Sequence, residues 1–144
     1  MSTSGRFPAL VRDRRGRGLR GPLAKDGTPL AMSRSHRFDE IVIGTVESLE
    51  RRWRAQLANV EFAVEDVPSL DDWERDWVPL ARSFPAEGAL PPRIVVFRRP
   101  IETRARALLA LRVLVAEVVV EQIAELLGTE PEEVDPQYGR RGRP

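Results

Sequence analysis

Residues 118–128, Val118-Val119-Val120-Glu121-Gln122-Ile123-Ala124-Glu125-Leu126-Leu127-Gly128, decide how the rest of the sequence is interpreted. They end an apolar segment that begins at Glu102 and contains no proline or glycine before Gly128. The segment is longer than a usual strand, so it predicts a long, largely buried helix despite its three consecutive valines. Gly128 is expected to cap this helix. Thr129 and Glu132 then predict a capping box for a short final helix.

Three glutamates of this helix, Glu117, Glu121 and Glu125, are four residues apart and therefore share one face. Like charges repel at this spacing, so the face must be solvated or matched by cations. The candidate cations, expected to close a salt-bridge cluster around Glu121 and Glu125, are Arg93, Arg98 and Arg99. The ridge is interpreted as the polar stripe of an amphipathic helix. A carboxylate site for Mg, Ca or Mn is the alternative, although no third ligand is evident.

The residues upstream predict one helix and two strands. Ser33 or Ser35 caps a packing helix that runs to about Ala58, and alternation from Asn59 to Asp66 then predicts a half-buried strand. A second strand is predicted for residues 93–100, and together these elements indicate an α+β fold. The polar connection between the strands contains Trp73 and Trp77. These two rings either cover the edge of the core or clamp a ligand.

Composition limits the classes of function. The 144 residues, 42% hydrophobic and 31% charged, are typical of one globular domain. No stretch approaches the roughly 20 apolar residues of a membrane span, and no signal peptide is recognisable, so a cytoplasmic protein without membrane partners is expected. The absence of cysteine excludes disulfides and thiol chemistry, and His36 is the single histidine. Nucleophilic catalysis by a Ser/His or Cys/His pair therefore has no suitable base.

The N-terminal arm, residues 1–34, is rich in glycine and proline and is expected to be mostly disordered. Residues 1–37 contain nine Lys/Arg and two Asp, a net charge of +7, whereas residues 38–144 contain 14 basic and 20 acidic residues, a net charge of −6. Flexible basic arms bind nucleic acid through phosphates, but no aromatic residue is interleaved here to stack on bases. A solubilising tail is the alternative. The nucleic-acid candidates are Arg12, Arg14, Arg15, Arg17 and Arg20.

Two motifs then carry a resemblance to a known family. They are residues 90–101, Leu-Pro-Pro-Arg-Ile-Val-Val-Phe-Arg-Arg-Pro-Ile, and the pattern Val118-Val119-Val120-x-x-Ile123-x-x-x-x-Gly128. The sequence from about 38 to 138 resembles the minimal zincin-like metallopeptidases common in actinobacteria. The resemblance implies a minimal zincin-like domain over residues 35–138, followed by a basic tail, 139–144. Such a domain has an N-terminal helix, a small sheet of two to four strands, a long C-terminal helix and a short final helix.

The resemblance also implies where a catalytic motif would lie. Members of the family place HExxH on the last long helix, and its positions fall here on Glu121, Gln122 and Glu125. The acidic third-ligand region falls on Glu130 and Pro131. Zinc in this motif needs both imidazoles, and the motif's glutamate acts as general base.

An amide such as Gln122 cannot accept and return a proton near neutral pH. The resemblance therefore implies a degenerate, inactive member with no cofactor, and zinc least of all. It would bind or scaffold an unidentified protein or peptide partner. A carboxylate-metal hydrolase using Glu121 and Glu125, and nucleic-acid association through the arm, remain the alternatives.

Overall fold

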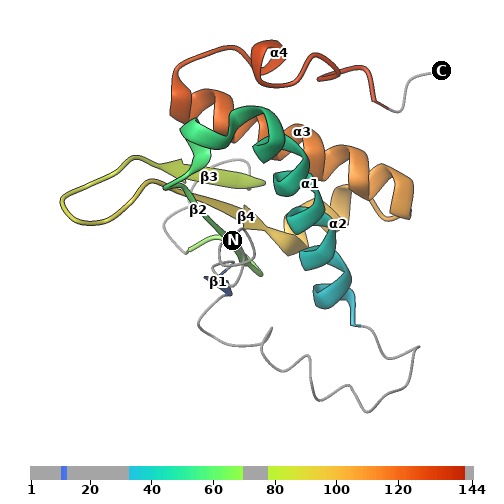
Figure 1. The fold of residues 1–144 in the computed structure, drawn as a ribbon. Coiled ribbons are helices and arrows are strands. Elements are labelled where there is room, and N and C mark those ends of the chain that lie inside the picture. Colours follow the sequence, from blue (N-terminus) through green and yellow to red (C-terminus); the bar gives the residue numbers. More distant parts are fainter. Residues whose placement is uncertain (1–10, 13–32, 70–77, 142–144) are drawn as a thin grey trace.

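The computed structural model describes residues 11–12, 33–69 and 78–141 (Figure 1). Its sheet has four strands in the order β1-β2-β4-β3. β1 (Val11–Arg12) and β4 (Arg93–Phe97) both run parallel to β2 (Glu61–Glu65), whereas the edge strand β3 (Ala81–Phe84) is antiparallel to β4. This mixed sheet and the helices packed on it confirm the α+β class.

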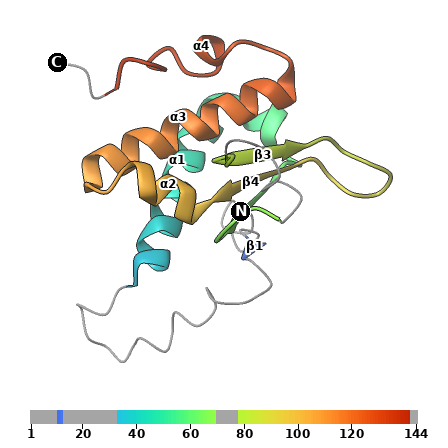
Figure 2. The same cartoon turned by 180° about the vertical axis from the view of Figure 1, so that it is seen from behind.

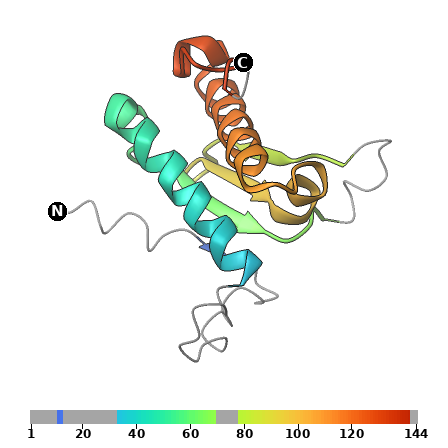
Figure 3. The same cartoon turned by 90° about the vertical axis from the view of Figure 1, so that its right-hand side faces the viewer.

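Two long helices, α1 (Arg34–Leu57) and α3 (Leu108–Leu127), lie on the same face of the sheet (Figure 3). The main core lies between them and the sheet. The alternation of β2 points Phe62 and Val64 into this core. Its largest fully buried side chains include Phe38, Ile94, Ile101 and Ile123. On the opposite face of the sheet, Ala63, Val95 and Phe97 form a second, smaller buried cluster.

The packing helix α1 has the predicted boundaries. Ser33 is its N-cap, and the Ser33 hydroxyl accepts a hydrogen bond of 3.1 Å from the backbone N–H of His36. The helix deviates at Trp53, whose φ and ψ of −116° and 33° are not helical. The indole N–H of Trp53 donates to the carbonyl oxygen of Val134 at 3.0 Å, which ties the end of α1 to the C-terminal part of the chain.

The segment from Arg93 to Leu127 differs from its prediction. The second strand ends at Phe97 instead of Pro100, and α2 (Arg98–Arg104) follows directly. Pro100 is tolerated because it is the third residue of α2, where its missing N–H would have no helical partner. The long helix starts at Leu108 rather than Glu102. Buried side chains on both sides of the break, Ile101 and Leu111, show that packing overrides local helix propensity here.

The C-terminal cap is confirmed, but the capping box is displaced by one residue. Gly128 has a φ of 73°, and its N–H bonds back to the carbonyls of Ala124 and Glu125. The N-cap of α4 (Pro131–Val134) is Glu130 rather than Thr129. Glu133 takes the role predicted for Glu132, because its carboxylate accepts from the Thr129 hydroxyl and from the Glu130 backbone N–H.

Three other features complete the comparison with the sequence. The short edge strand β3 was not predicted. Within the arm, Val11 and Arg12 pair with Ala63 and Val64 of β2. Trp73 and Trp77 lie outside the described residues. None of the described helices is both long and apolar enough to cross a membrane.

Candidate functional site

The glutamate ridge of α3 faces away from the core. Glu121 and Glu125 are exposed and Glu117 is half-buried. From Val113 to the end of α3, the other residues apart from Gln122 are apolar and are buried or half-buried, which leaves one narrow polar stripe. The buried residues of α3 are Leu111, Val115, Ala116, Val118, Val119, Val120, Ile123 and Ala124.

A tyrosine from the C-terminal segment reaches this stripe. After α4, the chain runs back alongside α3 (Figure 1 and Figure 2), and the hydroxyl of Tyr138 donates a hydrogen bond to the carboxylate of Glu121. The pKa of Tyr138 is raised from 10.0 to about 12, chiefly by this bond. Partial burial and the negative charges of Glu121, Glu117 and Glu132 contribute the rest of this rise. The Glu121 carboxylate thus has a neutral donor as its partner.

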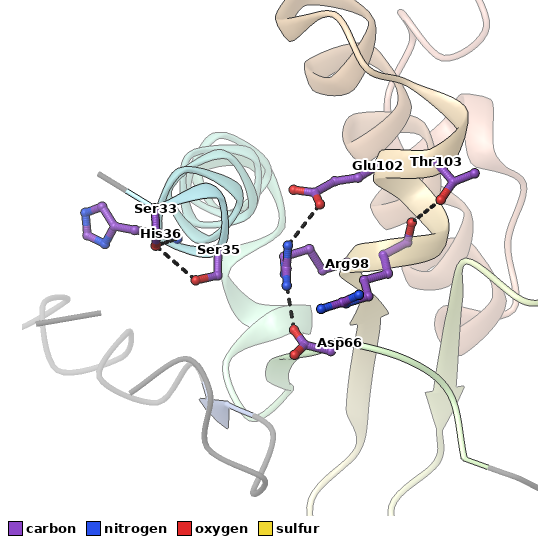
Figure 4. A network of polar contacts seen from close by, with 8 residues as sticks. Ser33, Ser35, His36, Asp66, Arg98, Glu102 and Thr103 are labelled. Atoms are coloured by element: carbon purple, nitrogen blue, oxygen red, sulfur yellow. Dashed lines mark hydrogen bonds and ion pairs between the residues drawn. The ribbon is translucent and has the colours of Figure 1, made fainter. Parts of the chain in front are cut away.

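The expected arginine cluster does not form around the ridge. Arg98 donates from Nε to Asp66 Oδ1 at 3.1 Å and from Nη1 to Glu102 Oε1 at 2.9 Å. Arg98 begins α2 and does not end a strand, and its side chain links Asp66, the residue after β2, to Glu102 of α2 (Figure 4). Across residues 33–69 and 78–141, no arginine is paired with Glu121 or Glu125.

Gln122 lies at the edge of the buried face of α3 and is half-buried. Its side-chain oxygen is buried and accepts no hydrogen bond from the described part of the chain. A buried polar atom without a partner is costly. The amide therefore does not help to anchor α3 through that oxygen.

No other described residue completes a metal site on the ridge. Within the parts of the chain that the structure describes, no three His, Asp or Glu side chains gather closely enough to hold a metal ion. Glu130, in the expected third-ligand region, is used as the N-cap of α4. His36 lies at the exposed start of α1, 3.2 Å from Glu40.

The structure places the other candidate residues away from the ridge. Arg12 contributes its backbone to β1, and Arg14, Arg15, Arg17 and Arg20 lie outside the described residues. A groove of about 670 Å³ separates α1 from α3, but Glu121, Gln122 and Glu125 do not line it. Tyr138 was not predicted as a site residue, because its contact with Glu121 depends on the path of the chain after α4.

The fold and the site together define a small α+β domain. Its last long helix ends in a left-handed glycine and carries an exposed acidic stripe. The family model described as zincin-like metallopeptidase matches residues 57–140, from the end of α1 to the C-terminal turns. The chain belongs to this family, as the resemblance predicted. No curated protein matches the chain.

Proposed function

We propose that this chain has kept the zincin-like fold without metallopeptidase catalysis, and that it acts in the cytoplasm as a binding or scaffolding module for a protein or peptide partner. The observation that carries the proposal is the hydrogen bond from Tyr138 to Glu121. Glu121 occupies the first histidine position of HExxH by resemblance. A carboxylate that holds a tyrosine hydroxyl there replaces an imidazole that would hold zinc.

The donor set of the motif positions does not fit zinc. Structural and catalytic zinc sites in proteins favour imidazole and thiolate donors. The three positions here supply two carboxylates and an amide, and one carboxylate is already bonded to Tyr138. Oxygen donors favour Mg or Mn, which need more ligands than these positions offer.

The general-base position supports the same proposal. In the family's motif a glutamate takes a proton from the attacking water and returns it to the leaving group. Gln122 has no titratable group, and its amide oxygen is buried in the edge of the core. Proton transfer therefore has no agent at this position.

The proposal is tested by converting the motif back. Wild-type protein and the variant Glu121→His/Gln122→Glu/Glu125→His are equilibrated with zinc, and the bound metal is measured by mass spectrometry alongside hydrolysis of a peptide library. We expect zinc only in the variant, with weak or no hydrolysis because Pro131 supplies no third ligand. The control carries histidines at Arg51 and Arg52, on exposed positions of α1. Stoichiometric zinc and peptide cleavage in the wild type, both lost in Glu121→Ala, would overturn the proposal.

The carboxylate-metal hydrolase has its own readout. Binding of an ion to the native state raises thermal stability. We expect no rise in melting temperature with Mn or Mg in the wild type, and the same result in Glu121→Gln and Glu125→Gln. A rise that both substitutions abolish would favour the hydrolase over the binding module.

Nucleic-acid association through the arm rests on the net charge of +7 that residues 1–37 carry. Because Val11 and Arg12 pair with β2, arm arginines are better substituted than deleted. Replacing Arg14, Arg15, Arg17 and Arg20 with glutamine should abolish DNA binding that weakens steeply with salt. Unchanged binding would exclude the arm as the binding element.

A further inference from the structure

A hollow of about 760 Å³ lies between the start of α1 and the helix α2, and no residue of the glutamate ridge lines it. Figure 4 shows Ser33, Ser35 and His36 of α1 on one side and Arg98, Glu102 and Thr103 of α2 on the other. We call it the arginine hollow, because five of the described residues that line it are arginines, from three segments of the chain. They are Arg34, Arg37, Arg98, Arg99 and Arg106.

One of the five arginines is structural. Arg98 is nearly buried, with 11% of its side chain exposed, and it is held by Asp66 and Glu102. Those two carboxylates hold its guanidinium in place, and together they carry one more charge than it does. Among the described residues that line the hollow, Glu102 is the one acidic side chain. Arg98 is therefore fixed and adds no net positive charge to the hollow.

The other four arginines are exposed, and no carboxylate among the described residues is paired with them. Arg34 and Arg37 come from the first turn of α1, Arg99 from α2 and Arg106 from the break before α3. None of them makes an ion pair within the described part of the chain. Four like charges around one hollow repel each other, so an anion that enters it relieves this repulsion as well as forming new bonds.

The backbone and hydroxyl groups of the hollow favour the same kind of ligand. Arg34 and Ser35 lie in the first turn of α1, where unpaired N–H groups and the helix dipole attract negative charge. The Ser35 hydroxyl, 3.1 Å from that of Ser33, faces the hollow. The Thr103 hydroxyl donates a hydrogen bond of 2.9 Å to the backbone carbonyl oxygen of Arg99. The start of α1 and Ser35 therefore supply donors to the hollow, and neither Ser35 nor Thr103 adds negative charge.

Guanidinium groups recognise phosphate through paired hydrogen bonds. None of the described residues that line the hollow is aromatic, so they offer a base no ring on which to stack. The concave shape gathers the charges around one volume, within the roughly 300–1,000 Å³ of small-molecule sites. A compact anion with several phosphates fits this arrangement better than an extended nucleic-acid backbone, which needs cations in a row.

We propose that the arginine hollow binds a compact oligophosphate, either a free polyphosphate or the phosphate chain of a nucleoside triphosphate. The site does not depend on the proposed loss of peptidase activity, and it uses none of the nucleic-acid candidates between Arg12 and Arg20. Its ligand is recognised by phosphate geometry and charge.

The test is calorimetric titration of the full chain with tripolyphosphate, ATP and AMP at fixed ionic strength. We expect tripolyphosphate and ATP to bind at one site and AMP at least about tenfold more weakly, because each lost phosphate removes charge-assisted bonds. Equal affinity for tripolyphosphate and ATP would show that a phosphate chain without a nucleoside is sufficient. Much tighter binding of ATP would identify a nucleotide as the ligand. Both results support the site. Binding of ATP without tripolyphosphate overturns it.

The variants Arg34→Ala and Arg99→Ala locate the site. Each substitution should weaken the binding of tripolyphosphate about tenfold, and the double variant should weaken it about a hundredfold. The circular dichroism spectrum should not change, because both side chains are exposed. Matched controls are Arg51→Ala, exposed elsewhere on α1, and Arg15→Ala in the arm; neither should change the affinity. Equal losses in the controls, or no binding by the wild type, overturn the proposal. The proposal is also overturned if a short DNA duplex binds more tightly than tripolyphosphate and Arg99→Ala abolishes this DNA binding.

Discussion

The hydroxyl of Tyr138 donates a hydrogen bond to the carboxylate of Glu121, seventeen residues earlier in the chain. The bond joins the turn after α4 to the exposed stripe of α3. It occupies the carboxylate of the residue that the resemblance predicts at the first histidine position of HExxH.

This contact predicts an unusual tyrosine titration. The pKa of Tyr138 is raised to about 12 chiefly by its bond to Glu121. Because the folded-state pKa lies above the ordinary value of 10.0, the contribution of the bond to stability is complete below about pH 10 and is lost as pH rises through about 12. Tyr138 is the single tyrosine, so tyrosinate absorbance in a pH-jump experiment reports on it alone.

Substitution identifies the cause of the shift. Glu121→Gln removes the acceptor's charge and should move the midpoint back toward 10. Glu125→Gln, one turn further along the same stripe, does not contribute to the shift and should leave the midpoint unchanged. A midpoint near 10 in the wild type would mean that the bond does not form in solution.

Two glycines predict opposite effects of the same substitution. Gly128 has a φ of 73°, so Gly128→Ala should lower the free energy of unfolding by about 1 kcal/mol. Gly44 lies inside α1, and a Cβ there would meet no atom within 4 Å. Gly44→Ala should raise the free energy of unfolding by about 0.5–1 kcal/mol, since alanine restricts the unfolded chain. Urea unfolding measures both, and the same sign in both variants would contradict the assigned cap.

The sequence predicted the elements whose patterns are long. The periods of α1 and α3 and the left-handed Gly128 follow from apolar spacing and from the absence of helix breakers. β3 was missed because it has four residues, lies between Pro79 and Pro85, and becomes a strand only by pairing with β4. The break between α2 and α3 was missed because no residue there disfavours a helix.

The candidate site shows the same division. The exposed stripe of Glu121 and Glu125 follows from four-residue spacing, which is local. The partner of Glu121 does not, because Tyr138 arrives through turns whose direction the sequence leaves open. The same holds for Arg98, which pairs with Asp66 and Glu102 once the strand ends one residue before it.

Arg98 predicts a marked loss of stability on substitution. Arg98→Met removes the cation that pairs with Glu102 and Asp66, and both carboxylates lie in nearly buried positions. Charge-assisted bonds of this kind contribute roughly 1.5–3 kcal/mol, so the free energy of unfolding should fall by about that amount. Arg98→Lys should recover only part of it, because an ammonium cannot span both carboxylates as a planar guanidinium does. Arg104→Met, an exposed position on the same helix, should change it by less than about 0.5 kcal/mol.

Trp53 predicts a smaller and more specific effect. Its indole N–H donates to the carbonyl of Val134 at 3.0 Å, where α1 departs from helical geometry, and so fastens the C-terminal segment to the first helix. Trp53→Phe keeps an aromatic ring in this half-buried position but removes the donor and leaves the carbonyl unpaired. The free energy of unfolding in urea should fall by about 1 kcal/mol with an unchanged denaturant dependence. Arg52→Ala, at an exposed neighbouring position, should change the free energy of unfolding by less than about 0.5 kcal/mol. An equally small change in Trp53→Phe would show that the bond does not hold this segment.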